Sequence, residues 1–542
     1  MADDLAHTLR GSWTADVHPL PDRMLRKLAR LIGTLPGETP AVDVPDAAVP
    51  PSALSVTAFD DLAAIVGEQN VKLDKDSRLA AASGLSYPDL IRFRGGTPLA
   101  VPDAVVRPAN PDDVAAVVRA CARLAVAVVP FGGGTSVVGG VAPLRGDKVA
   151  VIAVDLVRLD RLVSVDPVSR LAVVQAGVRG PDAERMLAVH GLTLGHYPQS
   201  FERATIGGFA ATRSAGQASS GYGRFEDMVV ALRVATPRGE WRLGVSPASA
   251  AGPDLRAMVV GSEGVLGIVT EVTLRVRPAP KARRYEAYAF DGWSRGLTAV
   301  RALAQHGVLA TVTRLSDVDE TMIALVGAGG RAETALRAYL AVRGVKDPCL
   351  LVVGWEASDD ATLATARWAT RRVLKAQRGV SLGKAPGEAW LKGRFGGPRQ
   401  RDALLDVGVC VETLETATYW SGVTSLREAV RAALTTALPT KAVVMCHVSH
   451  AYETGASLYF TVLTRRDPQD PVGQWEKAKA AASEAIAGHH RGTITHHHAV
   501  GVDHARYLES EIGELGVEVL RAVKHTLDQG DAQSRFPRSA WL

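Results

Sequence analysis

A run of three glycines at residues 132–134 constrains this chain more than any other feature of its sequence. The glycines follow a short apolar run at residues 126–131 and precede the hydroxyl pair Thr135 and Ser136. A Rossmann loop needs Gly-x-Gly-x-x-Gly opening a helix, but Val137 stands where the third glycine would fall, and helix breakers follow. A P-loop needs Gly-Lys-Ser/Thr at its end, which this run lacks.

The remaining interpretation is a loop whose own backbone wraps a pyrophosphate. Glycines permit positive φ and close approach to a ligand, and successive N–H groups form an anion-binding nest. Two further segments rich in Gly and small residues, 199–229 and 261–276, each contain or adjoin a strand-like run. Three such turns suit a long two-part ligand such as FAD, although the loop alone leaves open a turn without any ligand.

Composition and charge narrow the class of protein. The 542 residues are enough for two or three domains, and 47 % apolar with 22 % charged residues is ordinary soluble usage. The formal charge of +5 comes from interspersed residues, which favours either a plain solvated surface or a mild attraction for anionic substrates and membrane surfaces. We expect no nucleic-acid partner.

The cysteines and the ends of the chain bear on localisation. Four cysteines lie far apart without a CxxC pair, which argues against a disulfide framework or a thiolate zinc site and is typical of a reducing compartment. The N-terminus lacks a secretory pattern, no apolar run approaches the ~18 residues of a membrane span, and the C-terminus is not Ser-Lys-Leu. We expect a cytoplasmic protein, with membrane association at most at the periphery.

Alternating strand-like and helix-like segments predict an α+β fold. Val-rich runs at 147–156, 162–167, 170–178, 227–237 and 265–278 indicate strands, and residues 110–125 indicate a helix. Further helices are predicted at 21–34, 293–308, 360–377 and 503–527, and further strands at 349–355 and 456–466. We predict an N-terminal helical and linker segment at 1–57, a cofactor domain at 58–280, a cap domain at 281–495, and a segment at 496–542 that returns to the cofactor domain.

Histidines gather near the C-terminus. Eight of the fourteen histidines fall between His447 and His504, with a triplet at 496–498. On an extended strand His496 and His498 would share one face and His497 the other, so two could bind one metal but three could not readily do so. We expect no metal and favour general acid/base work, since imidazole titrates near neutrality. An exposed polar loop is the alternative for the triplet, and a core aromatic is the alternative for the phenol of Tyr459.

Four segments, read in order, resemble a known family: PFGGGTS, SFERATIGGFAATRSAG, YGRFEDMVVALRVATPRGE and GSEGVLGIVTE. They are similar to the vanillyl-alcohol-oxidase/p-cresol-methylhydroxylase flavoproteins. The resemblance implies a two-lobed PCMH-type FAD-binding domain, an α+β cap domain, and helical N- and C-terminal segments. Some members tether the flavin through a histidine just after the glycines; Thr135 stands there, which implies non-covalent FAD.

The resemblance also implies the residues that bind FAD. They lie in the glycine loop and in the two Gly-rich segments that follow it. They are Pro130, Phe131, Gly132, Gly133, Gly134, Thr135, Ser136, Gln199, Ser200, Phe201, Glu202, Arg203, Ala204, Thr205, Thr212, Arg213, Ser214, Ala215, Glu263, Gly264, Val265, Leu266, Gly267, Ile268 and Val269.

Five more segments narrow the resemblance: GHYPQS, VTRLSD, RQRDALLDVGVCVETLETATYW, SHAYETGASLYF and THHHAVG. From about residue 58 to 527 the chain resembles the alkylglycerone-phosphate synthases. Relatives that oxidise 2-hydroxy acids typically carry His-x-Gly-Asp-Gly-Asn-x-His, whereas this chain has HVSHAYETGASLYF. The resemblance implies a catalytic tyrosine, a histidine triplet, a histidine near flavin and substrate, an arginine important for activity, and an arginine that binds the substrate phosphate. The catalytic tyrosine is Tyr459, and the triplet is His496, His497 and His498. The histidine near flavin and substrate is His196. The arginine important for activity is Arg314, and the arginine that binds the substrate phosphate is Arg401.

The activity implied is exchange of the acyl chain of acyl-dihydroxyacetone phosphate for a long-chain alcohol, with no net redox change. Covalent catalysis would divide one slow displacement into two steps. Peripheral membrane contact and a homodimer are further expectations. The alternatives are an FAD-dependent oxidase or dehydrogenase of a hydroxy acid or alcohol, and a flavin-binding protein without catalysis.

Three features depart from the family pattern. The triplet is usually followed by Gly-Val-Gly-Lys, but here by residues 499–503, Ala-Val-Gly-Val-Asp. Arg399 stands where an aromatic residue is common, and the C-terminal tail lacks the usual Asn-Pro-Gly-Lys-like end. These departures bear on headgroup and chain preference rather than on flavin binding.

Overall fold

The computed structural model describes residues 19–37, 47–328 and 330–528. Helices and strands are mixed along the chain, which confirms the α+β class. Residues 38–46 of the expected linker lie outside the described residues. In the described part of the chain, no helix is both long and apolar enough to cross a membrane.

The first lobe holds the glycine loop. Its four-stranded sheet has the order β1 (Val71–Lys72), β2 (Ala104–Val106), β4 (Ala150–Asp155) and β3 (Val126–Phe131), with β2, β4 and β3 parallel. Helix α5 (Pro111–Leu124) begins there because the Asn110 side chain accepts hydrogen bonds from two first-turn N–H groups. Residues 132–149 form no helix after β3, as the glycine spacing predicts.

The second lobe is an antiparallel sheet. Its order is β5 (Leu162–Asp166), β6 (Leu171–Gln175), β10 (Ile268–Arg275), β8 (Val229–Thr236) and β9 (Gly239–Leu243). The two lobes share one apolar core, and β7 (Leu192–Thr193) pairs with β11 (Arg277–Pro278) beside them. The predicted strands of this half of the chain are therefore confirmed, within three residues at each end.

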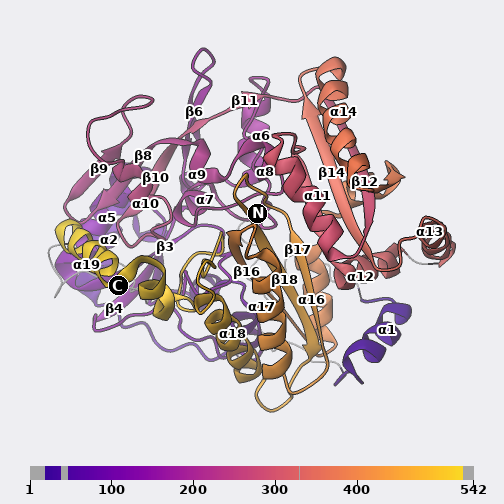
Figure 1. Ribbon diagram of the computed structural model, residues 1–542. Helices are drawn as coiled ribbons and strands as arrows, with labels where there is room; N and C mark the ends of the chain where they lie inside the picture. The colour runs from indigo at the N-terminus through magenta and orange to yellow at the C-terminus, as the bar shows by residue number, and fades with distance from the viewer. Residues whose placement is uncertain (1–18, 38–46, 329, 529–542) are drawn as a thin grey trace.

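The cap is built on a seven-stranded antiparallel sheet. Its order is β15 (Val380–Gly383), β12 (Ala282–Asp291), β14 (Pro348–Ala357), β13 (Val312–Ser316), β17 (Ala442–Val448), β18 (Gly455–Arg465) and β16 (Val409–Tyr419). Helices α11 (Trp293–Gln305), α14 (Asp360–Ala376), α17 (Val423–Ala437) and α18 (Pro471–Ala487) pack beside it. Figure 1 shows the cap beside the two lobes, with β16–β18 facing the glycine-loop side.

The remaining helices are short or lie at the edges of these sheets. They are α2 (Val56–Val66), α3 (Lys75–Ala80), α4 (Tyr87–Arg94), α6 (Gly180–Ala188), α7 (Ile206–Ala211), α8 (Ser219–Tyr222), α9 (Phe225–Met228), α10 (Leu255–Val259), α12 (Val318–Ala328), α13 (Gly330–Val342), α15 (Ala385–Gly393) and α16 (Gly397–Asp406), with 3₁₀ turns η3 (Glu68–Asn70), η4 (Leu156–Arg158) and η5 (Ala505–Tyr507).

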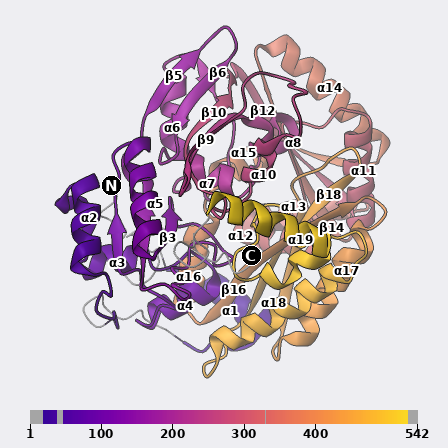
Figure 2. The same cartoon turned by 90° about the vertical axis from the view of Figure 1, so that its left-hand side faces the viewer.

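The two terminal helices pack on different halves. Helix α1 (Asp22–Ile32) buries Leu28 and Ile32 in the cap core. Helix α19 (Leu508–Leu527) packs Leu508 and Val517 against the 265–266 turn of the first half, as expected for the returning C-terminal segment (Figure 2). The large sheet begins at Ala282, just after β11; the exact domain limits stay predictions.

Candidate active site

The glycine loop packs its backbone against the segment at 203–205. A Cβ on Gly132 would lie 2.5 Å from Thr205 Oγ1, and one on Gly133 would lie 2.2 Å from the Arg203 carbonyl oxygen. Gly134 has φ +61°, and a Cβ there would meet the Phe131 ring at 2.7 Å. No larger residue fits at these three positions, because each glycine either touches a neighbouring segment or has left-handed backbone.

The loop also leaves backbone donors unused. Within the described residues, the N–H groups of Gly133, Gly134, Thr135 and Ser136 donate to no protein acceptor. Consecutive N–H groups without acceptors form a nest for an anion such as a diphosphate. The loop therefore fits the cofactor that the sequence predicts.

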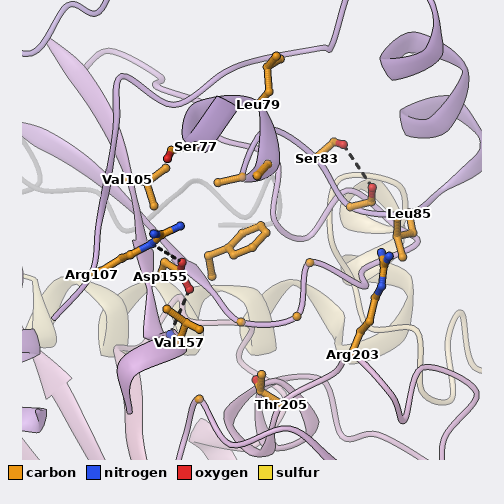
Figure 3. Close-up of a pocket in the computed structure, with 18 of the residues that line it drawn as sticks. Ser77, Leu79, Ser83, Leu85, Val105, Arg107, Asp155, Val157, Arg203 and Thr205 are labelled. Atoms are coloured by element: carbon orange, nitrogen blue, oxygen red, sulfur yellow. Dashed lines mark hydrogen bonds and ion pairs between the residues drawn. The ribbon is translucent and has the colours of Figure 1, made fainter. Parts of the chain in front are cut away.

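A cavity opens beside this nest (Figure 3). One wall comes from residues 79–85, whose Leu85 N–H donates to the Ser136 carbonyl at 2.6 Å. Arg107 and Asp155 line it as an ion pair 3.0 Å apart. Arg179 and Arg203 add two guanidinium groups, so the polar part of the cavity is mainly cationic, which suits phosphate oxygens.

Only part of the predicted cofactor set lines this cavity. Six predicted residues do so: Phe131, Gly132, Gly133, Gly134, Arg203 and Thr205. Thr205 also caps α7, where its Oγ1 accepts from the Gly208 N–H at 3.2 Å. The neighbours at 199–202 and Ala204 form the turn before this cap, and Phe201 stacks on Phe395 of the cap domain.

The other predicted cofactor residues make contacts within the protein. Thr212 Oγ1 donates to a backbone carbonyl of α7, and Arg213 donates to the carbonyls of Val260 and Ala257. Ser214 bonds His196, next to Ala215. Gly264 abuts Pro130, Val265 and Leu266 pack on α19, and Gly267, Ile268 and Val269 enter β10. Their binding role stays a prediction.

Glu263 has a role that sequence reasoning did not assign. Its carboxylate accepts hydrogen bonds from the N–H groups of Val500 and Gly501, at 3.0 and 3.1 Å. Val502 N–H donates to the Val138 carbonyl at 2.8 Å. The turn after the histidine triplet is therefore fixed directly to the glycine loop and to the 263 turn.

The triplet itself is organised by one buried carboxylate, Glu415 of β16. The backbone N–H groups of His496, His497 and His498 all donate to Glu415, at 2.8 to 3.0 Å. Thr495 Oγ1 adds a fourth hydrogen bond at 2.6 Å. Burial raises the pKa of Glu415, but the three histidines and Thr495 lower it by more than burial raises it. The net pKa therefore lies well below its usual range.

The expected alternation of faces within the triplet is wrong. Residues 494–500 form no strand, because the three N–H groups converge on one carboxylate instead of pairing with a neighbouring strand. His496 Nδ1 therefore lies 3.0 Å from His497 Nδ1, on the same side. Ring nitrogens of His450, His496 and His497 all lie within 4.8 Å of one another.

The sheet places Tyr459 beside this cluster. Across three strands, Glu415, Tyr459 and His447 are direct cross-strand partners, and such partners share one face. The His447 and Tyr459 rings stack 4.8 Å apart. The rings of His497 and His498 lie 5.9 and 5.5 Å from Tyr459. Burial raises the pKa of Tyr459 to about 12, so its phenol stays protonated at neutral pH.

Arg314 lies at the far end of this row. Its guanidinium contacts both ring nitrogens of His447, at 3.1 and 3.2 Å, and pairs with the carboxylate of Glu320. Burial raises the pKa of Glu320, but Arg314 and His447 lower it well below its ordinary value. Arg314 thus orients His447, while the carboxylate of Glu320 neutralises the charge of Arg314.

His196 comes from the cofactor half. Its Nε2 lies 2.9 Å from Ser214 Oγ, its ring packs edge-on against Phe209 and Phe225, and its Nδ1 is buried without a hydrogen-bond partner. Burial, with His497 and Arg224 nearby, lowers its pKa to about 3. The ring is therefore neutral and brings an unpaired nitrogen to the boundary between the two halves.

Arg401 lies on α16 and reaches the wall of the cavity. Its Nη1 donates to the Leu85 carbonyl at 2.7 Å, while its Nε is buried without a partner. Arg399, which departs from the family pattern, forms an ion pair with Glu202 at 2.8 Å. Val502 stands where the family has lysine, and the next residue, Asp503, pairs with Lys479 of α18.

Sequence reasoning missed residues in both parts of the site. Around the triplet they are Glu320, Glu415, His447, His450 and Tyr452. In the cavity they are Ser83, Gly84, Arg107, Asp155 and Arg179. Glu415 had a signal, because a carboxylate inside a Val- and Thr-rich strand is costly unless it has partners. Gly84 had none, although a Cβ there would lie 2.2 Å from the Ser136 carbonyl.

Comparison with known protein families agrees with this geometry. Residues 102–243 match the model of an FAD binding domain, and residues 279–529 match that of the FAD linked oxidases, C-terminal domain. The first match includes the glycine loop and the 203–205 segment. The second includes the cap sheet and the triplet.

Three individual proteins place the chain more narrowly. An alkyldihydroxyacetonephosphate synthase of Dictyostelium discoideum is 30 % identical, over 96 % of this chain and 88 % of the relative. A solved structure of an alkyldihydroxyacetonephosphate synthase superposes with a TM-score of 0.83 at 26 % identity, over 97 % of this chain and 98 % of the other. A p-cresol methylhydroxylase structure superposes with a TM-score of 0.65 at 14 % identity, over 90 % of this chain and 98 % of the other. This likeness shows the shared fold alone.

Proposed function

The chain belongs to the alkyldihydroxyacetonephosphate synthase family, and we propose that it is an FAD-dependent transferase that makes an ether-lipid precursor. Its substrates would be acyl-dihydroxyacetone phosphate and a long-chain alcohol. The observation that carries this is the convergence of Tyr459, His447 and the triplet on one face of the cap sheet, with Glu415 anchoring the triplet.

FAD would be held by the glycine loop, with its diphosphate on the free N–H groups and the cationic wall of the cavity. When bound, it supplies an electron-accepting ring that the side chains cannot supply. Thr135 supports non-covalent binding. Every proton and phosphate contact in the reaction then falls to the side chains of this chain.

The phosphate has a receptor in Arg401. Its Nε has no partner and its Nη1 is fixed by the Leu85 carbonyl, so the planar fork is oriented before substrate arrives. Arg203 lies near enough to interact electrostatically with Arg401, and burial lowers the pKa of Arg203 to about 10. The two guanidinium groups together suit a dianionic phosphate ester.

The proton steps fit Tyr459 and the neutral imidazoles. Burial lowers the pKa of His498 to about 3 and lowers that of His497, so each ring offers one N–H donor and one acceptor at neutral pH. Tyr459, with its raised pKa, donates a proton and recovers it from a neighbouring ring. His447, held by Arg314, fixes the orientation of the Tyr459 ring by stacking on it.

The test is an exchange assay without any electron acceptor. The purified holoenzyme, incubated anaerobically with acyl-dihydroxyacetone phosphate and hexadecanol, should release fatty acid in step with alkyl product. The flavin should be yellow and released by acid. Tyr459→Phe should abolish exchange and keep the flavin spectrum, whereas Tyr419→Phe, on an exposed side chain, should behave as wild type.

Two results would contradict the transferase. Lasting bleaching of the flavin by a hydroxy acid, without exchange, would support the oxidase or dehydrogenase alternative. Loss of flavin from Tyr459→Phe would mean that this residue acts in cofactor binding rather than in chemistry.

We also propose peripheral contact with a membrane, since both proposed substrates carry long apolar chains, and a homodimer. The four free cysteines, all buried, support the proposed cytoplasmic location. Co-sedimentation with anionic vesicles and light scattering would test the membrane contact and the dimer.

A further inference from the structure

The proposed exchange, on which this inference rests, leaves one proton over in each turnover. The bond from the substrate carbon to the acyloxy oxygen breaks, and a bond from that carbon to the alcohol oxygen forms. The fatty acid leaves as a carboxylate at neutral pH, since carboxyl groups titrate at about pH 4 to 5. The hydroxyl proton of the alcohol therefore has to leave the site.

The place where this proton is released is enclosed. His496 is 8 % exposed, the Glu415 side chain 0 % and His447 6 %, while His498 is half-buried. A proton held on His496 or His447 has little contact with bulk water, so a hydrogen-bonded route outward speeds its release.

A continuous hydrogen-bonded route begins at His497. His497 Nδ1 lies 3.0 Å from His496 Nδ1, and His496 Nε2 lies 2.6 Å from the Tyr452 hydroxyl. His497 also stacks on Tyr459, so the inner end of the route adjoins the proposed catalytic phenol. At the outer end, Tyr452 is half-buried and is followed by two exposed residues, Glu453 and Thr454.

The bonding pattern of this route allows a proton to pass. His496 uses Nδ1 toward His497 and Nε2 toward Tyr452, and His497 uses Nδ1 toward His496, so Nε2 of His497 is the nitrogen available for the incoming proton. Before transfer, His497 carries its proton on Nδ1 and His496 carries its proton on Nε2, and each N–H donates outward. After transfer, His497 carries it on Nε2 and His496 on Nδ1; both arrangements keep every ring neutral and hydrogen-bonded.

We propose that His497, His496 and Tyr452 form the proton-exit relay of this enzyme. His497 gains the alcohol-derived proton at Nε2 and gives its Nδ1 proton to His496. His496 gives its Nε2 proton to the Tyr452 oxygen, and the Tyr452 hydroxyl proton passes to water. One proton enters and one leaves, no bond to carbon changes, and no oxidant or reductant is needed.

Neighbouring groups hold the relay in place. Glu415 fixes the backbone of both histidines and lies 3.5 Å from His497 Nδ1, where it stabilises that ring during transfer. Arg224 donates to the His496 carbonyl at 2.7 Å. The backbone carbonyl of Tyr452 accepts from the Trp420 indole at 3.1 Å, which fixes the loop before β18 that carries the phenol.

A bound metal ion is the competing use of the same nitrogens. His450 stacks on His496 at 5.1 Å and its Nδ1 is buried without a partner. With His496 and His497 it offers three ring nitrogens within 4.8 Å, the donor set of a zinc-like site. The hydrogen bonds just described already use both nitrogens of His496, which favours the relay, and metal analysis separates the two.

The relay is tested on the holoenzyme by Tyr452→Phe, with Tyr419→Phe as the matched control. Fatty-acid release and proton release, the latter followed with a pH indicator in weak buffer, are measured at saturating substrate. Tyr452→Phe should lower kcat at least about tenfold with KM and flavin spectrum unchanged, since a proton-transfer partner is lost. Added imidazole should restore its rate in proportion to concentration and leave the wild type and Tyr419→Phe unaffected.

The outcomes distinguish the relay from the proposed function. If the wild type releases no fatty acid, the proposed function fails. If the wild type works and Tyr452→Phe equals it, or is slow without rescue by imidazole, the relay is overturned and the function stands. Stoichiometric metal in the wild type that is lost in His450→Asn would also overturn the relay, because metal-bound nitrogens carry no protons.

Discussion

The glycine cradle, proposed to bind FAD, and the histidine cluster, proposed to catalyse the exchange, are built by opposite means. The cradle is backbone: the 132–136 loop, its free N–H groups, and the close approach of residues 203–205. The cluster is side chains held by a single carboxylate, Glu415, from a strand about eighty residues earlier in the chain. A backbone site is specified by a few neighbouring residues, whereas a side-chain site depends on distant partners.

Removing the charge of Glu415 should therefore have the largest effect. In Glu415→Gln, one amide oxygen remains to accept from the backbone N–H groups, but an NH₂ donor replaces the second oxygen, which accepts from the His496 N–H. The negative charge is lost as well, and each unpaired buried donor costs about 1–3 kcal/mol. We expect exchange to fall at least about a hundredfold, since misplacing catalytic groups by an ångström costs that much. Fatty-acid release measures the loss of exchange, and flavin absorbance measures cofactor binding separately. Flavin should stay bound.

Glu518→Gln, at an exposed position on α19, is the matched control and should retain full activity. Wild-type exchange in Glu415→Gln would show that the triplet does not depend on the carboxylate, and the contrast between the two regions would disappear.

The converse change is Gly133→Ala in the cradle. The new Cβ would lie 2.2 Å from the Arg203 carbonyl, so the loop must move away from 203–205. We expect flavin affinity to fall about tenfold or more, in line with the cost of forcing extra atoms into a packed site. Flavin content after purification and titration with FAD measure it.

Gly393→Ala is the control, because a Cβ there meets nothing within 4 Å. Excess FAD should restore exchange to Gly133→Ala but not to Glu415→Gln. Full flavin content in Gly133→Ala would mean that the loop is not the diphosphate cradle.

The same contrast explains which parts were predictable from sequence. The absence of a helix after the glycines, the strands of both lobes and the helix at 111–124 follow from local spacing and capping, and all appear. The triplet was visible as a motif, but its geometry was not. The expectation of alternating faces assumed strand backbone, and the convergence of three N–H groups on Glu415 replaced it.

Long-range partners account for the other omissions. His447 and Tyr459 become neighbours through strand register, and Gly84 matters only because residue 136 folds over it. Neither relation leaves a trace in the spacing of the sequence. The buried charge of Glu415 is the exception, because an acidic residue inside a Val- and Thr-rich strand signals a hidden cationic or N–H partner.

Acidification should destabilise the fold through its buried histidines, an effect smaller than those above. Burial lowers the pKa of His196 and His498 to about 3 and that of His504 to about 4, below the usual value near 6.5. At pH values between the folded-state pKa and about 6.5, the unfolded chain binds more protons than the folded one. The neutral buried histidines therefore contribute their full stabilisation of the folded state above about pH 6.5, and this contribution is lost as pH falls toward the folded-state pKa. Each histidine should account for about 1 kcal/mol between about pH 7.5 and 5.5. Urea unfolding at both pH values should show a smaller loss of stability for His504→Asn than for wild type. The exposed control His190→Asn should lose as much stability as wild type. Equal losses in all three proteins would show that His504 does not contribute to the acid sensitivity.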